Sequence, residues 1–180
     1  MKIQKILLVM HFLAVSCVAF SEPATSVIKI RNGVTRVDFV GNGVSDIIIS
    51  GHRENFNAHS FDVVSFYIPV EDNWNIVPIF ENEKEKLQIT VSGGADCLLH
   101  DFRLIKGDFK KPATLIIADR EMGDSFVDQA KVVFTYYTLV RGEEIGSPIY
   151  GFVKSNTTEA KTKYCDVGEA FKNELSIGAR

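Results

Sequence analysis

The sequence lacks a long hydrophobic run and an excess of basic residues. Its 180 residues carry 20 Lys and Arg against 23 Asp and Glu, which gives a net charge of −3. Proteins that bind nucleic acid need a basic face for the phosphates, so this balance argues against a nucleic-acid partner. No segment after residue 21 reaches the roughly 20 consecutive apolar residues that a membrane helix requires. We therefore expect no transmembrane segment in that part of the chain.

Hydrolase motifs are missing as well. The chain contains no G-x-S-x-G sequence, no Walker loop, no dinucleotide fingerprint and no H-E-x-x-H zinc pair. Residues 26–29 match the letters of S-x-x-K, but no S-D-N or K-T-G partner follows, and the serine runs into a predicted strand. We therefore expect no catalytic residue of a known hydrolase class, no enzyme and no cofactor.

The first 21 residues have the pattern of a signal peptide. Lys2 and Lys5 precede an apolar run at residues 6–15, and small residues follow as far as Ser21. Cleavage after Ser21 would leave a mature domain of residues 22–180 and change the net charge from −3 to −5, because two lysines are removed. We predict that the mature protein works outside the cytoplasm.

Cysteine is scarce, with three residues in the chain. Cys17 leaves with the signal peptide, unless it is instead processed as a lipoprotein anchor. Cys97 and Cys165 then remain, and two cysteines in an oxidising compartment most simply form a disulfide. Two buried free thiols are the alternative.

Residues with high β-propensity dominate the mature chain and are divided by turn residues, which predicts a mainly β fold. Asn32-Gly33 predicts a tight hairpin turn that places Ile28 opposite Val37. Ile47–Ile49 has the pattern of a strand buried on both faces. Further strands are expected at residues 61–68, 74–80, 87–91, 97–105, 114–118, 130–141 and 149–154. We predict antiparallel strands in a sandwich-like or two-lobed single domain, with any boundary between lobes at residues 106–112.

One short helix is expected near the C-terminal end. Asp166 can act as its N-cap, and Glu169 lies three residues on, as a capping box requires. An apolar face then follows at the helical spacing, made of Val167, Ala170, Phe171 and Leu175.

The segment from residue 51 to residue 62 is unusually rich in distinct polar groups. The candidate ligand-binding residues in it are His52, Arg53, Glu54, Asn55, His59 and Asp62. One hypothesis is a polar pocket in which the histidines donate hydrogen bonds or transfer protons. The alternative is a loop that folds back and satisfies its own backbone groups.

The predicted strand at residues 97–105 carries further polar groups. Strand alternation puts His100 on one face with Phe102, whereas Asp101 and Arg103 share the other face, where they can pair. We expect His100 or Asp101 to join the polar loop in one site. The alternative is a histidine with a purely structural role.

Residues 38–46 resemble calcium loops, which place oxygen ligands at alternate positions around a glycine turn. Asp38, Asn42 and Asp46 have suitable spacing, although Val40 stands where an oxygen ligand is usual. A weak calcium site is one hypothesis, and a plain hairpin turn is the other.

Four segments together resemble a known family: residues 37–46, 51–67 and 92–103, and the segment around Cys165. The chain is similar to the CarG family of periplasmic carbapenem self-resistance proteins from antibiotic-producing enterobacteria. The resemblance implies a periplasmic factor that protects the cell from carbapenem by a route other than β-lactamase hydrolysis. It leaves open whether the partner is carbapenem itself, a cell-wall enzyme, a second resistance protein or a second copy in a homodimer.

Two hypotheses from other functional classes stand beside this one. The first is an extracellular interaction module assisted by calcium at residues 38–46. The second is an unrecognised periplasmic hydrolase that uses His52, His59 or Ser60.

Overall fold

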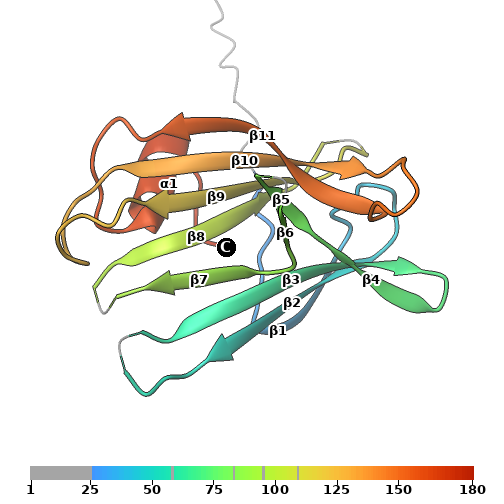
Figure 1. The fold of residues 1–180 in the computed structure, drawn as a ribbon, viewed down its shortest axis with the longest axis horizontal. Helices are drawn as coiled ribbons and strands as arrows, with labels where there is room; N and C mark the ends of the chain where they lie inside the picture. The colour runs from blue at the N-terminus through green and yellow to red at the C-terminus, as the bar shows by residue number, and fades with distance from the viewer. Residues whose placement is uncertain (1–25, 58, 83, 95, 109) are drawn as a thin grey trace, which may run out of the picture.

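The computed structural model describes residues 26–180 except 58, 83, 95 and 109, so the predicted signal peptide and Cys17 lie outside the described residues. As predicted, the fold is a mainly β single domain with one short helix (Figure 1). The elements are β1 (Gly33–Val37), β2 (Asp46–Arg53), β3 (Phe61–Val70), β4 (Asn73–Val77), β5 (Ile79–Glu81), β6 (Lys84–Lys86), β7 (Ile89–Gly93), β8 (Leu98–Ile105), β9 (Thr114–Arg120), β10 (Val132–Arg141), β11 (Tyr150–Glu159) and α1 (Val167–Leu175).

The strands form one sheet in the order β1-β2-β3-β7-β8-β9-β10-β11-β5-β6. Its pairings are antiparallel except the one between β11 and β5. β4 pairs with β3, while β5 pairs with β11, and only Pro78 separates β4 from β5. Because proline cannot donate a backbone hydrogen bond, the predicted strand 74–80 is split there. The two halves therefore connect β3 to β11, two strands that are far apart in the order of the sheet, and the sheet bends back on itself.

This bend creates two layers with the main core between them. In Figure 1, β1–β3 lie below β8–β11, and β4 crosses from one layer to the other. Phe66 on β3 lies 6.1 Å from Phe102 on β8 and 5.3 Å from Phe152 on β11, measured between ring centroids. All three side chains are fully buried. Edge-to-face aromatic contacts of this kind hold the layers together and support the sandwich-like description.

Helix α1 covers the other face of β9 and β10. Val167 and Phe171 are buried there with Ile116 and Phe134. β9 is therefore apolar on both faces, which explains its nearly continuous hydrophobic sequence. The predicted N-cap is confirmed, because Asp166 accepts hydrogen bonds from the backbone N–H groups of residues 168 and 169.

The predicted hairpin turn at Asn32-Gly33 is wrong. β1 begins at Gly33 and pairs with β2, so the hairpin turn lies in the segment between Val37 and Asp46. The residues before Gly33 run beside β8 instead, where the Ile28 N–H donates to the Leu104 carbonyl at 2.8 Å. Ile28 and Ile30 are buried in this position. The free energy gained by burying two such side chains, about 1.5–3 kcal/mol each, outweighs the local preference of Asn32-Gly33 for a turn.

Two further expectations need correction or refinement. Ile49 is 39 % exposed, so residues 47–49 are not buried on both faces as predicted. Residues 106–112 connect β8 to β9, which are neighbours in the same sheet, so this segment is a hairpin connection.

No helix among the residues that the structure describes is long and apolar enough to cross a membrane.

Candidate functional site

The polar segment forms the loop between β2 and β3, and its two flanking strands place a histidine beside a carboxylate. His52 and Asp62 are direct cross-strand partners, and His52 Nδ1 lies 2.8 Å from Asp62 Oδ1. His52 Nε2 lies 3.5 Å from Glu54 Oε2. The pKa of His52 is raised, chiefly by its hydrogen bond with Asp62. The ring is therefore held in place by carboxylates at both nitrogens.

The tip of this loop satisfies its own polar groups. Glu54 accepts hydrogen bonds from the Ser60 hydroxyl at 2.6 Å and from the Phe56 N–H at 2.7 Å. The Asn55 side-chain amide donates to the His59 carbonyl at 2.8 Å. The hydrogen bond from Ser60 is also the main reason that the pKa of Glu54 is lowered. This arrangement matches the folded-back loop for Glu54, Asn55 and Ser60.

The side chains of Arg53 and His59 contact aromatic rings. The Arg53 guanidinium lies 5.3 Å from the centroid of the Phe61 ring, a cation–π distance. The His59 ring lies 5.8 Å from the Phe126 ring. Both are therefore candidates for ligand contact whose loss would leave the hydrogen bonds of the loop intact.

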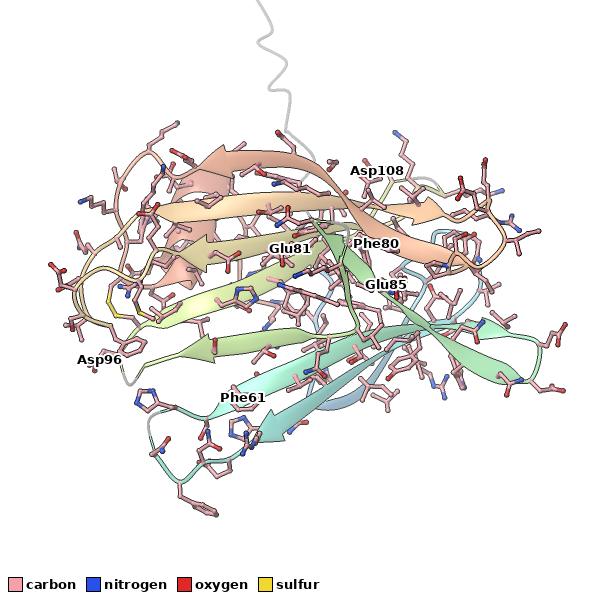
Figure 2. All side chains as sticks on the ribbon, in the orientation of Figure 1. Phe61, Phe80, Glu81, Glu85, Asp96 and Asp108 are labelled. Carbon is pink, nitrogen blue, oxygen red and sulfur yellow. A yellow bond between two sulfur atoms is a disulfide. The ribbon has the colours of Figure 1, made fainter. Side chains whose placement is uncertain are left out.

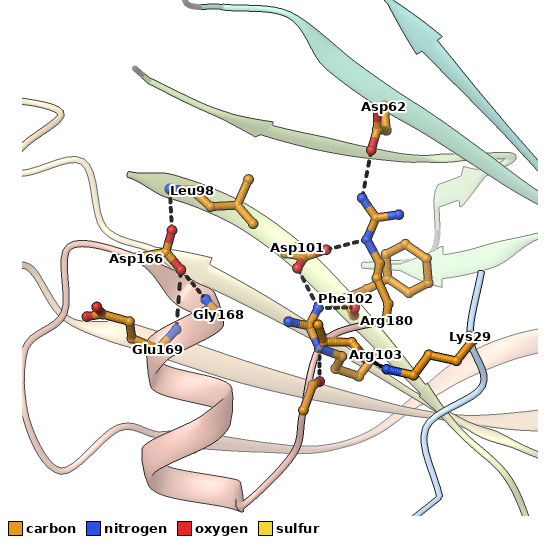
Figure 3. A network of polar contacts seen from close by, with 12 residues as sticks. Lys29, Asp62, Leu98, Asp101, Phe102, Arg103, Asp166, Gly168, Glu169 and Arg180 are labelled. Atoms are coloured by element: carbon orange, nitrogen blue, oxygen red, sulfur yellow. Dashed lines mark hydrogen bonds and ion pairs between the residues drawn. The ribbon is translucent and has the colours of Figure 1, made fainter. Parts of the chain in front are cut away.

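A chain of charged groups connects the loop to β8 (Figure 3). Asp62 Oδ2 accepts from Arg180 Nη2 at 2.7 Å, and Arg180 Nε donates to Asp101 Oδ1 at 3.0 Å. Asp101 also pairs with Arg103, as the strand alternation predicted. Arg103 Nε in turn donates to the Gly178 carbonyl at 2.7 Å. Arg180 therefore links Asp62 of the polar loop to Asp101 on β8, and the role of these residues as one site stays a prediction.

The loop end of this charged chain borders an open cavity of about 360 Å³, which we call the loop cleft. Its lining includes His52, Asp62 and Arg180, together with Gly93 and Gly94 at the end of β7. Burial alone would raise the pKa of Asp62, but hydrogen bonds from His52 and Arg180 lower it overall. Asp62 is therefore a firmly ionised carboxylate at the edge of the loop cleft.

His100 does not join the loop cleft but lines a second cavity of about 350 Å³, which we call the sheet pocket. Strand alternation turns it to the opposite face from Asp101, and its Nδ1 lies 2.5 Å from Oδ1 of its cross-strand neighbour Asp119. Tyr137 on β10 is 2 % exposed, and its burial, with smaller contributions from Glu81 and Asp119, raises its pKa to about 12. Glu81 lines this pocket, and Figure 2 shows it in a different part of the molecule from Phe61, the first residue of β3 after the loop.

Sequence reasoning missed Asp119, Tyr137, Glu81 and Lys86 of the sheet pocket. Asp119 reaches His100 only through the register of β8 and β9. Tyr137 follows an irregularity in the pairing of β10 with β11, which shifts the alternation of inward and outward side chains. Neither the register between two strands nor the position of a β-bulge can be read from one sequence. His100, a polar residue in an apolar strand, was the sequence signal that indicated this region.

The carboxylates of residues 38–46 close the β1–β2 hairpin. Asp38 accepts hydrogen bonds from the N–H groups of Gly41, Asn42 and Gly43 at 2.6–3.1 Å. Asp46 Oδ2 accepts from residues 39 and 40, and burial raises the pKa of Asp46. The described residues contain no group of three or more His, Cys, Asp or Glu placed to hold a metal ion. The geometry is that of a hairpin turn closed by its own side chains, and calcium binding there stays a prediction.

The predicted disulfide is present in the structure. It joins Cys97, just before β8, to Cys165, just before α1, with 5.5 Å between the two Cα atoms. Asp166 beside it also accepts from the Leu98 N–H at 2.9 Å. The helix is therefore fastened to β8 by a covalent bond and a hydrogen bond at the same point.

Alanine variants of Arg53 and His59 separate a ligand-binding loop from a structural one. If these side chains contact the ligand, Arg53→Ala or His59→Ala lowers the carbapenem resistance that the family resemblance implies, while the melting temperature changes by less than about 2 °C, because surface substitutions cost about 0.5 kcal/mol or less. Resistance and melting temperature are measured on the same variants. Asn55→Ala, which removes a bond inside the loop, is the matched control and lowers both quantities together. Unchanged resistance in both test variants would remove the loop from the functional site.

Comparison with known proteins gives one family and one solved structure. A family model described as "Carbapenem resistance protein CarG-like" matches residues 30–173. The crystal structure of CarG superposes with a TM-score of 0.71 at 24 % sequence identity, over 86 % of this chain and 99 % of that chain. At this identity the structural likeness concerns the fold alone. No curated protein matches the chain.

Proposed function

The chain belongs to the CarG-like family, whose model spans residues 30–173, and from this membership we propose that it is an exported carbapenem resistance protein. It protects the cell without hydrolysing the antibiotic. It works in the periplasm, either by binding carbapenem or by shielding a cell-wall enzyme that carbapenem attacks. The family match is the observation that carries the proposal.

The geometry around Ser60 supports a non-hydrolytic route. A serine nucleophile needs an adjacent base that can take its proton. Ser60 instead donates to Glu54, whose pKa is lowered, so this carboxylate is a weak base. The two ring nitrogens of His52 face Asp62 and Glu54, which leaves neither for the serine.

The sheet pocket supports the same conclusion. Its buried hydroxyl belongs to Tyr137, whose pKa of about 12 keeps the phenol protonated near neutral pH. A protonated phenol is a hydrogen-bond donor and a poor nucleophile. The proposed function requires no metal or cofactor.

Export is supported by two independent features. Residues 1–21 have the charge and hydrophobicity pattern of a signal peptide. The disulfide between Cys97 and Cys165 is typical of proteins that fold in an oxidising compartment such as the periplasm.

Incubation of the purified mature protein with a carbapenem tests the non-hydrolytic proposal. We expect the absorbance of the intact β-lactam ring to persist for hours at a tenfold molar excess of antibiotic, while a strain that produces the protein stays resistant. A known β-lactamase in the same assay is the positive control. Steady loss of absorbance with turnover above one per protein molecule would identify a hydrolase and overturn the proposal.

A further inference from the structure

The sheet pocket combines an apolar floor with a charged rim. Ile79, Ile89 and Ile117 line the floor and are 2–7 % exposed. The rim carries Glu81, Lys86, His100 and Asp119, whose side chains are 27–57 % exposed. A pocket of this form suits a ligand with an apolar body and a polar head that stays near the opening.

The charges on the rim favour a positive head group. Glu81 is paired with Lys86, so these two charges offset each other. Asp119 contacts the His100 ring, and apart from that imidazole the rim carries two carboxylates, Glu81 and Asp119, against the single ammonium group of Lys86. Burial is the main cause of the raised pKa of Tyr137 at the floor, and the negative charges of Glu81 and Asp119 add to it.

We propose that the sheet pocket is a binding site for an aliphatic chain that ends in a primary ammonium group. The methylene groups lie against the isoleucines of the floor, and the ammonium donates to the carboxylate of Asp119. When His100 Nδ1 carries the proton shared with Asp119, His100 Nε2 is a second acceptor for the same head group.

The same charges discriminate against a carboxylate. A negative head group at this rim would face Asp119 and Glu81, and like charges at contact distance repel. The free carbapenem anion is therefore a poor occupant of this pocket. This inference does not depend on the proposed function, since an ammonium site is compatible with either route of protection.

Three probes with one chain and different head groups test the proposal: hexylammonium, hexanol and hexanoate. NMR titration of the mature protein follows the ring signals of His100 and Tyr137. We expect hexylammonium to shift both rings and to bind at least about tenfold more tightly than hexanol, with hexanoate weakest. Equal or tighter binding of hexanoate, or no shift of either ring with hexylammonium, would overturn the assignment.

Variants locate the head group. Asp119→Asn is expected to lower hexylammonium affinity about tenfold, to the level of hexanol, while Asp124→Asn changes the same net charge on an exposed loop and leaves affinity unchanged. Glu81→Gln leaves the positive charge of Lys86 without its partner and is also expected to lower hexylammonium affinity. This variant replaces Asp119→Asn in the test if Asp119→Asn does not fold. Unchanged preference for the ammonium in both rim variants would contradict the proposal.

Discussion

Replacing Asp101 with alanine is expected to lower the free energy of unfolding by about 3–5 kcal/mol. The Asp101 side chain is 5 % exposed and accepts hydrogen bonds from Arg103, which is equally buried, and from Arg180. Removal of the carboxylate would leave the Arg103 guanidinium buried without its counter-charge, and an unpaired buried charge is among the largest single penalties in a folded protein.

Chemical denaturation of the mature protein measures this change, with Asp124→Ala on an exposed loop as the control for loss of one carboxylate. A double variant, Asp101→Leu with Arg103→Met, is expected to be more stable than Asp101→Ala alone, because it removes both charges and keeps the volume. A loss below about 1 kcal/mol in Asp101→Ala would show that water reaches Arg103 and that the charged chain in Figure 3 does not stabilise the fold.

The second large effect concerns the disulfide. Cys97 and Cys165 are 68 positions apart, so the bond closes a long loop in the unfolded chain. Its loss in Cys165→Ser is expected to destabilise the protein by about 4 kcal/mol, because the unfolded chain regains the conformational entropy that the crosslink removed.

Equilibrium denaturation compares Cys165→Ser with the wild-type protein, and the wild-type protein in reducing agent is the matched control. Cys165→Ser and the reduced wild-type protein should lose a similar free energy of unfolding. Mass spectrometry without reduction should show the linked peptides in the wild-type protein and not in the variant. Two freely alkylatable thiols in native wild-type protein from the periplasm would contradict the predicted bond.

The parts of the fold that the sequence predicts are those governed by local chemistry. Asp166 caps α1 because its side chain reaches N–H groups two and three residues away, which spacing alone reveals. Most strands also lie close to their predicted positions, since β-branched and aromatic runs between turn residues mark them.

The parts that the sequence does not predict depend on contacts between distant segments. The Asn32-Gly33 turn is replaced because Ile28 and Ile30 are buried near β8, which lies more than 60 residues away along the chain. His100 lines the sheet pocket, whereas Asp101 binds Arg180 beside the loop cleft, because the two side chains point to opposite faces of β8, so one predicted site becomes two. Asp119 lies beside His100 because of the register between β8 and β9. Arg180 lies beside Asp101 because the C-terminal segment runs past β8.

The two cavities differ in how far the sequence pointed to their residues. The loop cleft contains residues that the sequence singled out, His52 and Asp62, whereas the sheet pocket is built mainly from residues that it did not.

Carbapenem susceptibility of a sensitive strain, measured with and without residues 1–21 of the protein, tests the central claim most directly. We expect the complete chain to raise the minimum inhibitory concentration and the shortened chain to give no protection, although it accumulates as folded protein in the cytoplasm. The reason is that carbapenem acts on cell-wall enzymes outside the inner membrane. Equal protection by both forms would contradict an exported resistance protein.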